Sequence, residues 1–161
     1  MAKLVGSDLP EDLYRRLSGR ELESVADKVI LITTLDSNGW PHPAMLSYFE
    51  VIAKDRHNIR LATYKDSTTT SNMRRNGKLT ISIIDQRVAY YIKGRVEKLN
   101  DQLRCSPHNS KLNLRVEEVL TDQADEQLET GAHVTGGVTY ANPNRTAEEA
   151  KAREVLTELL E

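Results

Sequence analysis

The segment that says most about the fold is 61-LATYKDSTTTSNMRRNG-77. It starts with the apolar end of a strand, continues with the five hydroxyl residues 67–71 and then becomes basic. Asn76-Gly77 is typical of a helix end, so we predict a short helix over about residues 68–76. The start of a helix presents unpaired backbone N–H groups and the positive end of the helix dipole, which together suit a phosphate group.

Two interpretations of this junction stay open on the residues alone. In the first, side chains near the helix start bind a phosphate together with the backbone; the candidates are Ser67, Thr68, Thr69, Lys65, Arg74 and Arg75. In the second, the hydroxyls only cap the helix and keep its first turn polar.

Strand-like patterns lie on both sides of this segment. β-branched runs and alternating apolar residues predict six strands, at about 29–35, 44–52, 59–64, 79–84, 88–97 and 112–120. Pro41 and Pro43 cannot donate to a strand ladder, so we expect regular pairing of the second strand to begin near Ala44. Most of these strands are separated by short polar turns, which is typical of hairpins.

Helical patterns are confined to the two ends and one connection. Residues 7–26 are predicted to form one or two short helices, because Leu9, Leu13 and Leu17 recur every four residues. A second helix is expected at about 146–160, where an apolar stripe would dock on the core. A doubly wound sheet needs a helix after almost every strand, so this order predicts a mainly β fold, a six-stranded antiparallel barrel with α decoration.

Length and charge limit the possible partners. A chain of 161 residues is the size of one domain, so we expect 1–161 to fold as a unit with its barrel at about 28–122. The net charge of −2 favours neither nucleic acid nor an anionic membrane, and no segment resembles a signal peptide or a membrane span. Cys105 is the only cysteine, which favours a reducing cytoplasm, and we expect it to be an inert thiol in a loop. The four histidines are dispersed, so no metal site is predicted.

Three motifs in register resemble the pyridoxamine 5'-phosphate oxidase-like family of FMN-binding split barrels. The segment 61–77, followed by Lys78 and a strand, resembles the FMN-phosphate segment of that family. The stretch 33-TTLDSNGWPHP-43 resembles its first hairpin, and 90-YYIKGRVE-97 resembles its strand ending in Gly-x-Ala/Val-Glu. The resemblance covers about residues 25–122.

The resemblance implies a homodimer with FMN in the cleft between two barrels. By position, the flavin ring would lie along Ala44, Met45, Leu46 and Ser47. The cofactor would run past Ala62, Thr63 and Tyr64, and its phosphate would be held by Ser67, Thr68 and Thr69. The implied function is a flavin-dependent oxidoreductase with a small-molecule substrate, and no catalytic residue can be named.

The chain also departs from the oxidases proper. These carry an Arg at the position of Ala44, a Lys near Phe49 and Arg-Lys at the positions of Thr68-Thr69. The loss of charge-assisted contacts weakens a phosphate site, so oxidation of pyridoxamine phosphate itself is not expected. Three alternatives follow: a flavin-binding or sensing protein with little turnover, a deazaflavin protein, and a haem-binding or haem-degrading protein with His42 or His133 as the ligand.

Overall fold

The computed structural model describes residues 1–161, of which 41% form strands and 22% form helices. The strands are β1 (Ala2–Gly6), β2 (Val29–Leu35), β3 (Pro41–Ser47), β4 (Val51–Ala53), β5 (Asn58–Tyr64), β6 (Lys78–Asp85), β7 (Val88–Asn100) and β8 (Asn109–Asp122). The helices are α1 (Glu11–Leu17), α2 (Leu22–Val25), α3 (Thr68–Asn76) and α4 (Arg145–Leu160). All strand pairs are antiparallel, so the predicted mainly β class is confirmed, while the predicted six strands are corrected to eight.

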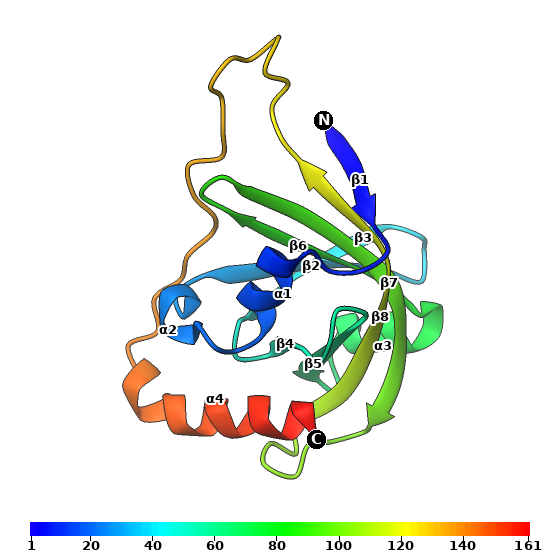
Figure 1. Ribbon diagram of the computed structural model, residues 1–161. Helices are drawn as coiled ribbons and strands as arrows, with labels where there is room; N and C mark the ends of the chain where they lie inside the picture. The colour runs from blue at the N-terminus through cyan, green and yellow to red at the C-terminus, as the bar shows by residue number, and fades with distance from the viewer.

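The sheet curls back on itself because the strands at its two ends are neighbours in the chain. Its order is β3-β2-β6-β7-β8-β5-β4, and β1 adds to β8. Only Tyr48, Phe49 and Glu50 separate the end of β3 from the start of β4, so the two edges must lie close together. The result is a split half-barrel whose terminal strands do not pair with each other (Figure 1).

The two additional strands have separate causes. β1 was not predicted, because its sequence shows no alternation of apolar and polar residues. Most of its residues are exposed in the structure. The predicted strand 44–52 is divided into β3 and β4 by a turn in which Tyr48 and Phe49 are buried.

Pairing of β3 begins at Pro41 rather than near Ala44, opposite Leu35 of β2. The prediction about the prolines was wrong because β3 is an edge strand, and a proline on its unpaired side removes no hydrogen bond.

The terminal helices belong to the same core as the barrel. Leu9, Leu13 and Leu17 are at most 1% exposed and join a cluster of 28 buried apolar residues. From α4, Val155, Leu156 and Leu159 join the same cluster, and the helix packs across β4 and β5 (Figure 1). Both helices therefore bury their apolar residues against the barrel, where each contacts β4.

A polar cluster ties α1 to the sheet. Arg16 forms an ion pair with Asp85 at the end of β6, and its Nε donates to the hydroxyl of the buried Tyr48 at 2.8 Å. Lys28 lies 3.3 Å from the same Asp85 carboxylate. Burial raises the pKa of Asp85, but hydrogen bonds from Arg16 and the Gln86 N–H outweigh it and lower the pKa overall.

Candidate functional site

The predicted strand-to-helix junction is present, and its cap geometry explains why α3 starts and ends where it does. Ser67 is extended, with φ −77° and ψ 153°, and its Oγ accepts a hydrogen bond from the Thr70 N–H at 3.2 Å. Gly77 closes the helix in the left-handed region at φ 70°. Both predicted ends of the helix are therefore confirmed.

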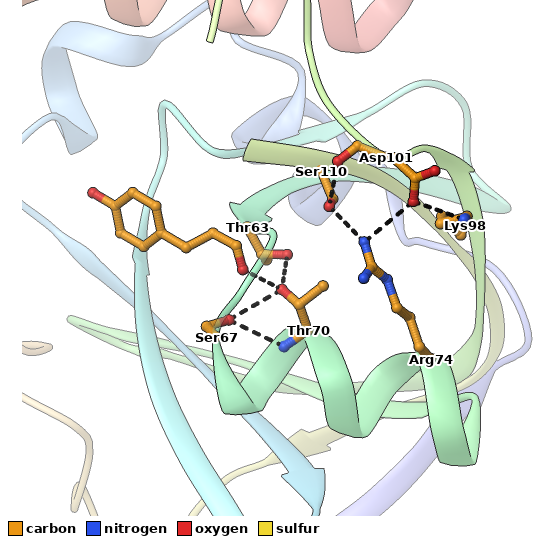
Figure 2. A network of polar contacts seen from close by, with 8 residues as sticks. Thr63, Ser67, Thr70, Arg74, Lys98, Asp101 and Ser110 are labelled. Atoms are coloured by element: carbon orange, nitrogen blue, oxygen red, sulfur yellow. Dashed lines mark hydrogen bonds and ion pairs between the residues drawn. The ribbon is translucent and has the colours of Figure 1, made fainter. Parts of the chain in front are cut away.

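Several hydroxyls of the junction are used inside the fold. The Thr70 hydroxyl donates to the Tyr64 carbonyl at 2.7 Å and lies 2.6 Å from the Thr63 hydroxyl (Figure 2). The Ser67 hydroxyl also reaches Thr70, at 3.1 Å. This network locks the end of β5 to the first turn of α3, so the hydroxyls of Thr63, Ser67 and Thr70 position the junction.

Other polar groups at the start of α3 stay available. The backbone N–H groups of the first helical residues, Thr68 and Thr69, have no partner within a helix. The Thr68 side chain is exposed, whereas Thr69 is only 8% exposed. These donors can bind an anion that approaches along the helix axis.

The structure separates the three candidate cations. Arg74 donates to the Ser110 hydroxyl at 2.9 Å and lies 3.5 Å from the Asp101 carboxylate (Figure 2). Arg75 donates to the Leu35 carbonyl at 2.7 Å, at the far end of the helix. Lys65 is the one candidate whose side chain makes no hydrogen bond or ion pair within the chain. Its ammonium group is therefore available to bind an anion.

The four predicted residues of β3 do not share one face, because consecutive strand residues point to opposite sides. Ala44 and Leu46 are half-buried and pack against the core. Met45 is 66% exposed on the outer face of the sheet. Ser47 ends the strand, where its N–H and hydroxyl donate to the Glu50 carboxylate at 2.7 and 2.8 Å.

The three predicted residues of β5 differ in the same way. Ala62 is fully buried, and its N–H donates to the Glu50 carbonyl at 2.8 Å. Thr63 is buried in the hydroxyl network, while the Tyr64 ring is 67% exposed. Of this group, only Tyr64 offers a free side chain to a ligand.

Helix α3 contacts both β3 and β5, so the fold brings the three predicted segments around one helix. Ser47 and Tyr64 also line a common cleft of about 330 Å³ between the β3–β4 turn and α4. A larger hollow of about 540 Å³ lies elsewhere, beside the β6–β7 turn, and contains His133 but none of the ten predicted cofactor residues.

The 330 Å³ cleft also contains residues that were not predicted, namely Glu50, Tyr140 and Arg145. Burial raises the pKa of Glu50, although the hydrogen bonds from Ser47 oppose that shift. Tyr140 and Arg145 lie far from Ser47 and Tyr64 in sequence and join them only because α4 folds back across β5. No local motif could have indicated this.

No group of three or more His, Cys, Asp or Glu side chains gathers as a possible metal site. None of the helices has the length and apolarity needed to cross a membrane.

Comparison with known proteins gives a consistent relationship. A family model described as pyridoxamine 5'-phosphate oxidase matches residues 21–116. The uncharacterized protein YclD of Bacillus subtilis is 32% identical over 99 residues, which are 62% of this chain. The chain spans 58% of the length of that relative.

Two solved structures show the same fold at low sequence identity. A Lactobacillus delbrueckii protein, provisionally assigned as a pyridoxamine 5'-phosphate oxidase, has a TM-score of 0.57 and 18% identity, over 74% of this chain and 98% of its own. An FMN-binding protein from Syntrophomonas wolfei has a TM-score of 0.53 and 15% identity, over 71% of this chain and 92% of its own.

Proposed function

The chain belongs to the pyridoxamine 5'-phosphate oxidase family, and on that basis we propose that it binds FMN and acts as a flavin-dependent oxidoreductase on a small molecule. The observation that carries the proposal is the start of α3, where the N–H groups of Thr68 and Thr69 are free and the strands predicted to line the flavin meet the same helix. When bound, FMN supplies the hydride-accepting chemistry, so the chain needs only to hold and shield it.

The residues present fit such a cofactor. The first-turn N–H groups of α3, the exposed Thr68 hydroxyl and the unpaired Lys65 would bind the phosphate. The ring would lie along β3, whose outer edge has no partner strand in this chain. Ser47 and Tyr64 would stand at the mouth of the neighbouring cleft.

The absence of the cations found in the oxidases proper supports weaker binding of the cofactor phosphate. Phe49 and Ala44 are uncharged, and both face the core, Phe49 with 4% exposure in the turn between β3 and β4. Each charge-assisted contact is stronger than a neutral hydrogen bond, so FMN would be held less tightly than with Arg and Lys at these sites. A flavin-binding protein with little turnover is the second candidate, and this shortage of cations favours it.

We also propose a homodimer that places the cofactor between two copies. Strand register aligns a mostly apolar row on the outer face of the sheet, made of Met45, Leu31, Ser82, Tyr91, Leu120 and Leu4. Met45 and Leu4 are 66% and 67% exposed. The adjacent row is polar and contains the Lys93–Glu118 ion pair, at 2.9 Å. A second copy of this face would cover the apolar row and supply the second wall that a flat ring needs.

Two broader expectations belong to the same proposal. One buried cluster draws on α1, the barrel and α4, which supports a single domain over residues 1–161. The single Cys105 favours a cytoplasmic protein.

The visible absorption spectrum of freshly purified protein tests the cofactor, with the supernatant analysed after denaturation. Flavin bands whose chromophore is released on unfolding, and which bleach when NAD(P)H is added under anaerobic conditions, would support the oxidoreductase. A bound flavin that no donor reduces would leave only the flavin-binding protein. A colourless protein that also fails to bind added FMN would contradict the cofactor assignment.

A further inference from the structure

The cleft beside the proposed flavin site contains an arginine that forms no salt bridge, although its positive charge opposes the rise in the pKa of Glu50, which lines the same cleft. Arg145, the first residue of α4, is half-buried, and no carboxylate oxygen lies within 4.0 Å of its guanidinium nitrogens. The guanidinium lies 4.8 Å from the centre of the Phe49 ring and 5.2 Å from that of Tyr140, and it donates to the Tyr140 hydroxyl. Two aromatic rings thus orient the guanidinium while most of its N–H donors remain without a partner.

The same cleft has aromatic and charged walls. The exposed rings of Tyr64 and Tyr140 supply flat apolar surfaces, while the buried Phe49 ring packs under the guanidinium. Lys151 also lines the cleft, and its ammonium group lies 3.5 Å from the Glu154 carboxylate. The acidic side chains accept hydrogen bonds from other residues of the cleft: Glu50 accepts two from Ser47, and Glu148 accepts one from Asn142 at 2.9 Å. Their negative charge still lies in the cleft and opposes a second charge on a ligand.

We propose that this cleft binds a small aromatic molecule with one carboxylate, held by Arg145. A planar guanidinium matches a carboxylate in a two-point contact, and the exposed rings of Tyr64 and Tyr140 match a flat ring. The nearby Glu50 and Glu148 select a monoanion over a dianionic phosphate ester, because like charges repel in a partly buried site. This inference rests on the proposed function in one respect: the ligand would be the substrate, next to the flavin ring at Ser47 and Tyr64.

Calorimetric titration tests the proposal with sodium benzoate as the probe and does not depend on bound flavin. The titration is made on the full chain with and without added FMN, and the flavin spectrum is followed in the loaded sample. We expect benzoate to bind and to perturb the flavin bands, and benzamide and phenyl phosphate to bind at least roughly tenfold more weakly. Equal binding of benzoate and benzamide would overturn the proposal, and this comparison needs no variant.

Substitutions of Arg145 then test whether this residue binds the benzoate carboxylate. Arg145→Gln should weaken benzoate binding roughly tenfold or more, with partial recovery in Arg145→Lys. The matched control is Arg153→Gln on the same helix, which removes a charge that pairs with Glu149 outside the cleft and should change nothing. Unchanged benzoate affinity in a folded Arg145→Gln protein would overturn the proposal.

The outcomes separate this inference from the cofactor assignment. A protein that binds FMN but not benzoate keeps the proposed function and loses the carboxylate site. A protein that binds benzoate through Arg145 but never FMN keeps the site and loses the flavin.

Discussion

The Glu158 carboxylate of α4 accepts a hydrogen bond from the backbone N–H of Cys105 at 2.9 Å, which joins the last turn of the chain to the loop before β8. The same carboxylate accepts the Arg104 N–H at 2.7 Å, and Glu158 is only 6% exposed. Burial by itself raises the pKa of Glu158, but the two backbone donors and the Arg104 charge outweigh it and lower the pKa to about 2. This contact therefore links the stability of the C-terminal helix to pH.

Glu158→Gln is expected to destabilise the protein by about 1–3 kcal/mol at neutral pH, because it weakens charge-assisted hydrogen bonds from the partly buried N–H groups of Arg104 and Cys105. A folded-state pKa below the unfolded value of 4.5 means that the wild-type carboxylate contributes fully above that value. The contribution is lost as pH falls from 4.5 toward about 2, so the difference between variant and wild type should shrink there. Urea unfolding at several pH values measures the difference in free energy of unfolding. The control is Glu149→Gln, which removes the exposed ion pair with Arg153 on the same helix and should have little effect. An equal loss of stability in both variants would contradict the role given to Glu158.

Cys105 should react slowly with thiol reagents while the protein is folded. Partial burial and the neighbouring Glu158 raise the pKa of its thiol to about 11, so little thiolate exists near neutral pH. The rate of modification by iodoacetamide at pH 8 should rise several-fold on unfolding in guanidinium. A folded-state rate equal to that of the unfolded chain would show that the thiol is neither buried nor opposed by Glu158.

Substitutions of Ser67 and Thr68 should have different effects, the first on stability and the second on cofactor binding. Ser67→Ala removes the cap of α3 and should cost about 1 kcal/mol in thermal unfolding. Thr68→Ala removes an exposed hydroxyl that makes no hydrogen bond in the chain, so stability should change by less than about 0.5 kcal/mol while FMN affinity falls. Titration of FMN, followed by fluorescence quenching, measures the FMN affinity of Thr68→Ala. Unchanged FMN affinity in Thr68→Ala would argue against a phosphate at this helix start.

Gly94 should tolerate no side chain. A Cβ at this position would lie 2.1 Å from the Arg115 carbonyl oxygen, where β7 and β8 pair through a bulge. Backbone cannot move aside easily, so we expect Gly94→Ala to lower stability by about 3 kcal/mol or more, or to prevent soluble expression. Gly136→Ala is the control, because nothing lies within 4 Å of its added Cβ. A Gly94→Ala melting temperature equal to that of wild type would contradict the close strand approach.

Leu31→Glu tests the proposed dimer face. Leu31 lies in the middle of the apolar row, so a charge there should convert a dimer into a monomer and reduce FMN binding roughly tenfold or more. Light scattering after size-exclusion chromatography gives the mass. Thr157→Glu, on the exposed side of α4, should leave both properties unchanged. A wild-type monomer would contradict the dimer directly.

Local patterns account well for the elements that the sequence predicted. Helix α3 matches its predicted range because its start and end depend on Ser67 and Gly77, which act within one turn. The inward residues of β6, such as Ile81, follow directly from the alternation of apolar and polar residues, whereas β2 was predicted from a β-branched run that is apolar on both faces. The family resemblance rested on these local motifs and is confirmed by the match over residues 21–116.

What the sequence determined by itself was therefore the antiparallel β class, the strand-to-helix junction and the family. The edge position of β3, which makes Pro41 and Pro43 tolerable, was decided by sheet order, and sheet order depends on contacts between distant segments. The tertiary structure alone also committed Arg74 to Ser110 and Asp101, left Lys65 free, and brought Arg145 beside Phe49. These outcomes depend on which side chains meet after the sheet curls and α4 folds back, and no local periodicity records such long-range contacts.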